Sequence, residues 1–457
     1  MSDFDLPGGW LQTSLGEIAD WGSGGTPSRK TESYYGGTIP WVKTGDLGPK
    51  VLTQASEFIT GQAIANSSAK FFPKGSVAIA MYGATIGKTS ILGIDATTNQ
   101  ACGVGSPIKG VTFTEFLYYM LCNEKDNFIA KGKGGAQPNI SQALIKEHEI
   151  ALPPLAEQHQ IAQKLNELLA QVDTLKTRLD AIPKILKRFR QSVLAAAVSG
   201  RLTEEWRGVQ AEKLDEWRWV TLGEISDVKG GITKDSKKQE SAFIELPYLR
   251  VANVQRYFLD LNEIKTIRIP ANRVKDLLLE DGDILFNEGG DLDKLGRGWI
   301  WEGQIPNCSY QNHVFRARLK NRADNSKYIS WWGNTEGFEY FIRNGKQTTN
   351  LASINKTLLS NLPINLPPSK EQTEIVRRVE QLFTYADQIE QRVKDAQKRV
   401  NHLTQSILAK AFRGELTAEW RAQNPDLISG ENSAAALLER IKAEREATAK
   451  PKKKVKV

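Results

Sequence analysis

One motif, present twice, organises this chain of 457 residues. It reads LPPLAEQHQI at Leu152–Ile161 and LPPSKEQTEI at Leu366–Ile375. A second motif repeats at the same offset of about 214 residues and reads GRLTEEWR at Gly200–Arg207 and GELTAEWR at Gly414–Arg421. The ungapped stretch from the first motif to the second is identical at about 21 of 56 positions, far beyond chance. The chain is therefore an internal duplication.

The segments upstream of each copy match more loosely. Weak similarity links SLGEIADWGSGGT (Ser14–Thr26) to TLGEISDVKGGIT (Thr221–Thr233), and GSVAIAMYGATIGK (Gly75–Lys88) to GDILFNEGGDLDKLGR (Gly282–Arg297). Variable halves therefore alternate with similar blocks. We expect a first variable domain at 1–150, a central helical block at 151–207, a second variable domain at 208–365, a second helical block at 366–424, and a C-terminal helix with a basic tail at 425–457.

Each similar block carries an apolar seam whose steps alternate between four and three residues. The first seam runs through Ile161, Leu165, Leu168, Val172, Leu175, Leu179, Ile182, Leu186, Phe189 and Val193, and the second through Ile375, Val379, Leu382, Ala386, Ile389, Val393, Ala396, Val400, Leu403 and Ile407. A period of about 3.5 residues is typical of paired helices, whereas a helix on a globular core favours about 3.6 and a wider apolar face. We therefore predict two long helices that form an antiparallel coiled coil.

Prolines and glycines mark the ends of both expected helices. Pro153-Pro154 and Pro367-Pro368 stand at the starts, and Gly200 and Gly414 stand at the stops. Pro183 lies inside the first seam, where it should kink or locally break the helix.

The variable halves show a different pattern. Short β-rich runs at Val77–Met81, Pro247–Val251, Ile284–Phe286 and Trp299–Trp301 are separated by turns rich in glycine, asparagine, aspartate and proline. Helical patches lie near Glu115–Cys122 and Tyr328–Phe341. We therefore predict that each half is an independent α/β domain. The whole chain is predicted to have an α+β fold with an internal pseudo-twofold repeat.

Composition limits the partners and the compartment. Lys+Arg 61 against Asp+Glu 53 gives a net charge of +8, and five of the lysines lie in the last eight residues. A site for a polyanion must therefore come from local patches. The cysteines, Cys102, Cys122 and Cys308, are far apart without metal-ligand spacing, which favours a reducing compartment. With an acidic, turn-rich start and no long apolar stretch, we expect a cytoplasmic protein without a membrane span.

Motifs for nucleotide and methyl-donor chemistry are incomplete. The nearest approach to a Walker A loop is GATIGKT at Gly83–Thr89, which is one residue short because Tyr82 stands where the first glycine is needed. No GxGxxG follows a strand, and the Asn-Pro-Pro-aromatic element of adenine methyltransferases is missing. The four histidines are scattered. We therefore expect a binding protein that is not an enzyme and holds neither a cofactor nor a metal ion.

Loops in both variable halves hold side chains that can bind phosphates and base edges. In the first half these candidates are Lys43, Thr44, Lys88, Asn99, Gln100, Lys133, Gln137 and Asn139, and in the second half they are Arg250, Asn253, Lys294, Arg297, Gln311, Asn312, His313, Lys346, Gln347 and Asn350. Lysine and arginine suit guanine, and asparagine and glutamine suit adenine. Singly, each is more often an ordinary loop or turn residue. Their recurrence beside strand ends in both halves indicates a DNA-binding surface.

Two variable domains that alternate with two similar helical blocks resemble the specificity subunit of type I restriction–modification systems. The resemblance is to the EcoKI-like, type IA family, and it is specific over Leu152–Arg207 and Leu366–Glu444. It is general over the variable halves. It implies that each half is a target-recognition domain that reads one part of a split DNA site, while the paired helices hold these domains apart.

The resemblance also implies partners. Two methyltransferase subunits would dock on the helical blocks, and two motor–nuclease subunits would join through the complex. Because two copies of one surface recruit two copies of one partner, the repeated GRLTEEW and GELTAEW elements are the expected docking surface. Trp206 and Trp420 are the expected anchors, although packing of each indole against its own helix is an equally good interpretation.

Two other functions remain open at this point. One is a duplicated scaffold that binds peptides or glycans, which the modest net charge allows. The other is a stand-alone methyltransferase or helicase, which the incomplete nucleotide motifs oppose. A steep dependence of DNA binding on salt, as phosphate contacts require, separates the scaffold from the DNA-binding protein.

Overall fold

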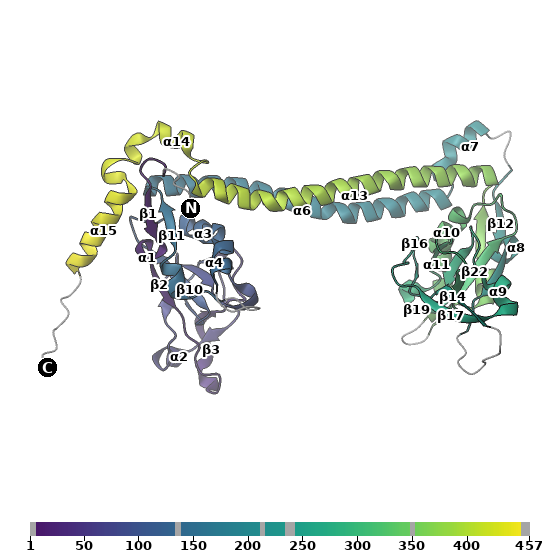
Figure 1. The fold of residues 1–457 in the computed structure, drawn as a ribbon, viewed down its shortest axis with the longest axis horizontal. Helices are drawn as coiled ribbons and strands as arrows, with labels where there is room; N and C mark the ends of the chain where they lie inside the picture. Colours follow the sequence, from purple (N-terminus) through teal and green to yellow (C-terminus); the bar gives the residue numbers. More distant parts are fainter. Residues whose placement is uncertain (1–5, 133–138, 211–214, 234–242, 348–351, 449–457) are drawn as a thin grey trace. The chain divides into compact units, whose positions relative to one another are not determined.

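The computed structural model describes residues 6–132, 139–210, 215–233, 243–347 and 352–448, which fold into two compact units. One unit comprises residues 1–179 and 395–457, and the other residues 180–394. Each unit contains one variable half packed against one end of both long helices (Figure 1). This mixture of sheets, short helices and two long helices confirms the predicted α+β class. The five-segment division of the chain stays a prediction.

The two long helices begin and end where the sequence predicts. Helix α6 spans Leu155–Val198 and α13 spans Ser369–Phe412, each with 44 residues. Both begin directly after a proline pair. Both end before a glycine in the left-handed backbone region, where φ is +77° at Gly200 and +76° at Gly414. Only glycine enters this region without a penalty from Cβ, so these residues stop the helices.

Half of the 20 seam residues are buried, as pairing of the helices requires, and eight more are partly buried. The buried members are Ile161, Leu165, Val172 and Val400 in the first unit, and Leu186, Val193, Ile375, Val379, Ala386 and Val393 in the second. Leu175 and Leu403 are exceptions, with exposed fractions of 46% and 42%. The long helices therefore fit the predicted coiled coil, although its seam is covered unevenly.

Pro183 does not break α6. The helix is continuous from Leu155 to Val198 with this proline inside it, so the local break, one of the two expected outcomes, is wrong. A proline removes the hydrogen bond that its own N–H would donate to the carbonyl four residues earlier. Pro183 is exposed, so water can satisfy that carbonyl while the remaining turns keep the helix intact.

The first unit contains two larger sheets and one two-stranded sheet. The larger has the strand order β2-β10-β7-β8-β4, with β2 at Ala19–Ser23, β10 at Cys102–Pro107, β7 at Val77–Ala80, β8 at Thr89–Leu92 and β4 at Val51–Leu52. The smaller has the order β5-β3-β9-β6, with β5 at Phe58–Ile59, β3 at Tyr35–Val42, β9 at Ala96–Thr98 and β6 at Phe71–Phe72. Strand β1 (Leu11–Ser14) pairs with β11 (Glu149–Leu152), so both ends of the variable half meet where α6 begins. The short helices are α1 (Leu15–Ile18), α2 (Gly61–Ala65), α3 (Thr114–Asn123), α4 (Lys125–Lys131) and α5 (Gln142–Lys146).

The second unit repeats this plan. One sheet has the order β13-β22-β18-β20, with β13 at Ser226–Gly230, β22 at Val314–Leu319, β18 at Ile284–Asn287 and β20 at Gly298–Ile300. Another joins β17 (Lys265–Pro270), β14 (Phe243–Leu249) and β21 (Ser309–Tyr310), and β12 (Arg218–Thr221) pairs with β25 (Pro363–Leu366). Smaller sheets pair β15 (Val254–Gln255) with β16 (Phe258–Leu259), and join β19 (Gly289–Gly290), β24 (Ala352–Ser353) and β23 (Lys346–Gln347). The short helices are α8 (Leu222–Ile225), α9 (Val274–Leu277), α10 (Ser326–Asn334), α11 (Glu336–Asn344) and α12 (Lys356–Ser360).

The repeat extends into the variable halves. Strands β2, β10, β7 and β8 of the first unit match β13, β22, β18 and β20 of the second in their order within the sheet. All the strands predicted from β-rich runs are present, as β7, β14, β18 and β20. The predicted helical patches are α3 and the pair α10 and α11, which is divided at Thr335. Shared strand order with little shared sequence means that apolar patterning, more than residue identity, sets this framework.

The buried carboxylate of Glu157 holds distant segments of the first unit together. It lies in the first LPP motif, has no exposed surface, and accepts hydrogen bonds from Trp10 Nε1 at 2.8 Å and Thr417 Oγ1 at 2.6 Å. Arg421 Nη2 donates to it at 2.8 Å. Thr417 and Arg421 belong to the second copy of the GxLTxEWR motif and flank the start of α14 (Ala418–Gln423). We call Trp10, Glu157, Thr417 and Arg421 the first junction.

The second unit contains the reciprocal cluster. Glu371, in the second LPP motif, is also fully buried and accepts hydrogen bonds from Trp217 Nε1 at 2.8 Å and Thr203 Oγ1 at 2.8 Å. Arg207 Nε, in α7 (Glu204–Gln210), donates to it at 3.1 Å. These four residues form the second junction. Each LPP motif thus binds the GxLTxEWR motif of the other block, which explains why the two motifs are duplicated together.

The glutamine after each buried glutamate ties the long helix to its variable half. Gln158 Oε1 accepts from the backbone N–H of Phe113 at 2.8 Å, directly before α3. Gln372 Oε1 accepts from the N–H of Asn325 at 2.7 Å, directly before α10. Both side chains are fully buried. The Glu-Gln pair of each LPP motif therefore holds three chain segments together.

Replacing Arg421 with methionine should destabilise the first unit strongly. The substitution leaves the Glu157 carboxylate buried without its cation, and such a loss costs about 3 kcal/mol in the free energy of unfolding. Urea denaturation of the full chain measures this change. Arg413→Met is the control, because Arg413 forms an exposed ion pair with Glu415 and its loss should leave the free energy of unfolding nearly unchanged. Equal effects of the two substitutions would contradict the role assigned to the junction.

Candidate nucleic-acid interface

In the first unit, two parallel strands end side by side and bring the predicted loops together. Strands β3 and β9 pair in parallel with Trp41 opposite Thr97 and Val42 opposite Thr98. The N–H of Asn99 donates to the carbonyl of Val42 at 2.9 Å. The pairs Lys43-Thr44 and Asn99-Gln100 therefore leave adjacent strand ends.

A second pair of loops joins this edge. The N–H of Met81 donates to the carbonyl of Ala101 at 2.8 Å, and Tyr82 forms an isolated β-bridge with Asn139. Lys88 is exposed and precedes β8 in the same hairpin. We call the surface formed by Lys43, Thr44, Tyr82, Asn99, Gln100 and Asn139 the first loop face. Lys133 and Gln137 lie outside the described residues.

The second unit has the same arrangement. Strands β14 and β21 pair in parallel with Leu249 opposite Tyr310, and the N–H of Gln311 donates to the carbonyl of Leu249 at 2.8 Å. The N–H of Glu288 donates to the carbonyl of His313 at 2.9 Å, as Met81 does to Ala101. Arg250 thus takes the place of Lys43, and Asn312 that of Gln100. Arg250, Glu288, Gln311, Asn312 and His313 form the second loop face.

The candidates differ in how accessible they are. Exposed side chains are Lys88, Gln100, Asn139, His313 and Lys346, and partly exposed ones are Lys43, Thr44, Asn99, Arg250, Lys294, Arg297, Gln311 and Asn312. Asn253 is only 3% exposed. Gln347 lies in β23, and Asn350 lies outside the described residues. The accessible members are the ones available to bind a ligand.

Ion pairs neutralise part of the positive charge of the candidate residues. Hydrogen bonds from Arg29 hold the pKa of Glu57 at about 2, and Lys43 adds to this effect through an ion pair of 3.1 Å. Arg29 also stacks over the rings of Tyr35 and Trp41, at 4.2 Å and 5.2 Å from their centroids. Lys43 is therefore tethered at the first loop face.

Asn253 performs a structural task in the second unit. Its Oδ1 accepts from the N–H of Arg250 at 2.9 Å, and its Nδ2 donates to the carbonyls of Asp260 at 2.8 Å and Glu263 at 3.0 Å. In the first unit, Asp46 Oδ2 accepts from the N–H of Lys43 at 2.9 Å in the same way. The side chains of Asn253 and Asp46 therefore shape the turns that present Arg250 and Lys43.

Sequence reasoning missed two residues of the loop faces. Glu288 hydrogen-bonds with His313 Nδ1, and Tyr82 is 41% exposed beside Asn139. The loosely repeated segments Gly75–Lys88 and Gly282–Arg297 contain both residues, so their alignment was the available signal. The two units therefore present different chemistry at equivalent places, since Met81 and Ala101 stand where Glu288 and His313 lie.

The described residues give little indication of a nucleotide-phosphate site or of a metal site. The near-Walker segment forms a 3-10 turn at Gly83–Thr85 followed by strand β8. This segment therefore does not lead into an α-helix whose N-terminus could bind a phosphate. The described residues contain no group of three or more His, Cys, Asp or Glu side chains that could hold a metal ion. None of the helices in the described part of the chain is long and apolar enough to cross a membrane.

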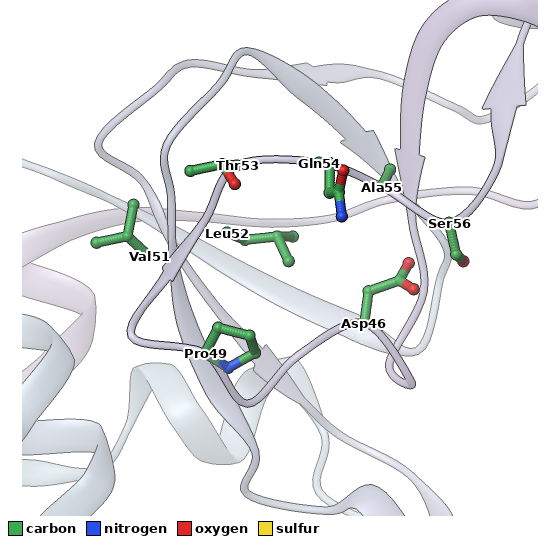
Figure 2. A pocket seen from close by; sticks show the side chains of 8 residues that line it. All are labelled: Asp46, Pro49, Val51, Leu52, Thr53, Gln54, Ala55 and Ser56. Atoms are coloured by element: carbon green, nitrogen blue, oxygen red, sulfur yellow. The ribbon is translucent and has the colours of Figure 1, made fainter.

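A pocket of about 300 Å³ lies close to the first loop face (Figure 2). It is lined by Asp46, Pro49, Val51, Leu52, Thr53, Gln54, Ala55 and Ser56. Asp46 is its one ionisable lining residue, and that carboxylate already accepts from the N–H of Lys43. Figure 2 shows Thr53, Gln54 and Ser56 as its other polar side chains, and the remaining lining residues are apolar. The pocket therefore holds a single ionisable group, and that group is already used within the turn.

Comparisons with known proteins agree on one family. A model described as the type I restriction modification DNA specificity domain matches residues 7–184 and 214–397. The chain is 37% identical to the type I restriction enzyme EcoKI specificity subunit of Escherichia coli K12, over 98% of both chains. It is 37% identical to the StySPI specificity subunit of Salmonella potsdam, over 96% of both. The crystal structure of the HsdS subunit from Thermoanaerobacter tengcongensis shares the fold, with a TM-score of 0.57 at 20% identity over 91% of this chain and 99% of that one.

Replacing Asn253 with alanine should cost stability, whereas replacing Asn312 should not. Asn253→Ala leaves partly buried backbone groups without partners and should lower the free energy of unfolding by about 1 kcal/mol. Asn312 is partly exposed, so Asn312→Ala should change it by no more than about 0.5 kcal/mol. Urea denaturation of both variants of the full chain makes the comparison. If Asn253→Ala is as stable as the unchanged chain, the structural task assigned to Asn253 is wrong and its side chain is again a candidate ligand contact.

Proposed function

Since the chain belongs to the family of type I restriction–modification specificity subunits, we propose that it reads a split site on double-stranded DNA, one part with each loop face. The observation that carries this proposal is the internal repeat, which places equivalent loops at equivalent strand ends in both units. One chain thereby presents two reading surfaces. The chain itself is not an enzyme in this proposal, and it works in the cytoplasm, where DNA and its partner subunits are found.

Differences between the loop faces would give the two parts of the target different sequences. Arg250 can donate two hydrogen bonds to guanine, and Gln100 and Asn312 can pair with adenine. Glu288 can accept from the amino group of cytosine, whereas Met81 at the equivalent place cannot. Lys43 and Lys88 would bind phosphates, which positions the protein without reading sequence. Asn253 and Asp46 would act by shaping the turns.

The duplicated helical blocks would recruit the other subunits. Two methyltransferase subunits would dock on the two copies of the block, and two motor–nuclease subunits would join through the complex. Trp206 in α7 and Trp420 in α14 are partly exposed and each precedes the arginine of a junction. They would anchor the partners. A duplicated scaffold for peptides or glycans has no support from the EcoKI and StySPI relatives, which are specificity subunits.

Exchanging one recognition domain should change one part of the target. When residues 1–150 are replaced with the equivalent domain of a relative, DNA selected by the assembled complex should keep one half-site and acquire a new second half-site. The reason is that each loop face belongs to a single unit. Methylome sequencing of a host that carries the hybrid chain with its partner subunits identifies both half-sites. A change in both would contradict independent reading.

Removing both anchor tryptophans should weaken assembly and leave the recognition domains folded. The Trp206→Ala, Trp420→Ala double variant should bind the methyltransferase subunit at least about tenfold more weakly, because buried indoles commonly contribute about 2 kcal/mol to an interface. Analytical ultracentrifugation measures affinity and stoichiometry. Trp219→Ala is the matched control, since this indole is 68% exposed and lies outside the repeated blocks. Unchanged affinity in the double variant would assign the partner surface elsewhere.

A further inference from the structure

Two side chains of the first loop face, those of Tyr82 and Asn139, are held next to each other by the backbone. The two residues form an antiparallel β-bridge, and the N–H of Ile140 donates to the carbonyl of Met81 at 2.9 Å. Ile140 is fully buried, so it anchors the chain directly after Asn139. Residues opposite each other in an antiparallel pair point their side chains to the same side, with Cβ atoms about 4.5–5.5 Å apart. Tyr82 and Asn139 therefore present a ring and an amide side by side.

Neither of these side chains is bonded within the unit. The Tyr82 side chain is 41% exposed, and that of Asn139 is exposed as well. Within the described residues, the Tyr82 hydroxyl and the Asn139 amide have no hydrogen-bond partner, and the Tyr82 ring stacks on no other ring. An aromatic ring and an amide are therefore free to contact a ligand.

The second unit has an equivalent pair with different side chains. In β19 and β24, Gly289 lies opposite Ser353. The residue after Ser353 donates its N–H to the carbonyl of Glu288 at 2.7 Å, which repeats the backbone bond of the first loop face. Gly289 therefore stands for Tyr82, and Ser353 stands for Asn139.

This comparison shows that the framework does not require the ring or the amide. No side chain fits at Gly289, where a Cβ would lie 2.1 Å from the carbonyl oxygen of Ala352. The hairpin of the second unit therefore closes without a ring, and the shorter hydroxyl of Ser353 replaces the amide. Because one backbone framework accepts both pairs, the side chains of Tyr82 and Asn139 are not needed to form it.

Two lysines add positive charge beside the pair. Lys88 is exposed on the same hairpin, and Lys125 packs against this hairpin, since a Cβ at Gly87 would lie 2.6 Å from Lys125 Cγ. Neither lysine forms an ion pair within the described part of the chain. The turn of the equivalent hairpin in the second unit instead exposes the carboxylates of Asp291 and Asp293. Lysines attract the phosphates of DNA and carboxylates repel them, so the hairpin of the first unit is the better suited to lie against DNA.

From these observations we propose that Tyr82 and Asn139 together read one A·T base pair, in the part of the target bound by the first unit. The Asn139 amide would donate to N7 of adenine and accept from its N6 amino group. The ring of Tyr82 would contact the 5-methyl group of the paired thymine. This inference rests on the proposed function and deepens it, because it names a base pair and the two residues that recognise it.

Removing the amide should change one position of the target. Sequences selected from random duplex DNA by the full chain, with its partner subunits present, give the preference at each position. Asn139→Ala should reduce the preference for A·T at one position by about tenfold, because two hydrogen bonds to adenine are lost. That position should lie in the half-site that follows residues 1–150 in the domain exchange. Phe71→Ala is the control, since this ring of the first unit is 54% exposed in β6 and is not part of the loop face, so the selected sequences should not change.

Uracil tests the ring, because it lacks only the 5-methyl group of thymine. When uracil replaces thymine at that position, the unchanged chain should bind about fourfold more weakly, since one buried methyl group contributes about this much. Tyr82→Ala should bind both DNAs equally, and Tyr82→Phe, which restores the ring, should restore the difference. Competition between labelled duplexes measures these ratios. A substitution that only disturbed the fold would weaken binding to both DNAs and keep the difference between them.

Three results would overturn this inference alone. The first is selection of a split target in which Asn139→Ala leaves every position unchanged. The second is equal binding of the thymine and uracil DNAs by the unchanged chain, and the third is a difference between them that persists in Tyr82→Ala. A chain that selects no DNA sequence at all would instead overturn the proposed function, and this inference with it.

Discussion

The fold depends on two buried carboxylates. Each is stable in the interior only because groups far away in the sequence bind it. Glu157 and Glu371 have no exposed surface, and each is held by a tryptophan, a threonine and an arginine. An unpaired carboxylate in such a place is strongly unfavourable. Each helical block therefore completes the cluster that the other block begins. This reciprocity links the start of each long helix to the turn that follows the end of the other.

The variable halves share a backbone framework but carry different side chains in their loops. Equivalent backbone hydrogen bonds, such as Asn99 to Val42 and Gln311 to Leu249, hold the loop faces at the same strand ends in both units. The side chains that these loops present differ, because the framework bonds use N–H and C=O groups that every residue carries. This division explains why the helical blocks match closely in sequence while the variable halves match loosely.

The sequence was sufficient for features that repeat locally and insufficient for those assembled in space. A seam with steps of three and four residues, bounded by prolines and by Gly200 and Gly414, predicts both long helices because periodicity and capping are local. The break at Pro183 was wrong, since one missing hydrogen bond does not end a helix of this length. The duplicated motifs contain the Glu-Gln and Thr-x-x-x-Arg residues of the junctions, but only the structure shows that each LPP motif binds the GxLTxEWR motif of the other block. Among the candidate contacts, burial separates Asn253, which shapes a turn, from accessible residues such as Gln100, and sequence carries no direct measure of burial.

The long separation within the first junction has a consequence for how the protein is made. Glu157 and Arg421 are 264 residues apart in the chain, whereas Glu371 and Arg207 are 164 apart and both emerge before Arg421. At a synthesis rate of roughly 5–20 residues per second, the ribosome takes about 13–53 s to travel from Glu157 to Arg421. During that interval the glutamate of the first junction has been synthesised but its cation has not. The unit that begins at the N-terminus is therefore the last to have all of its residues synthesised, after every residue of the second unit.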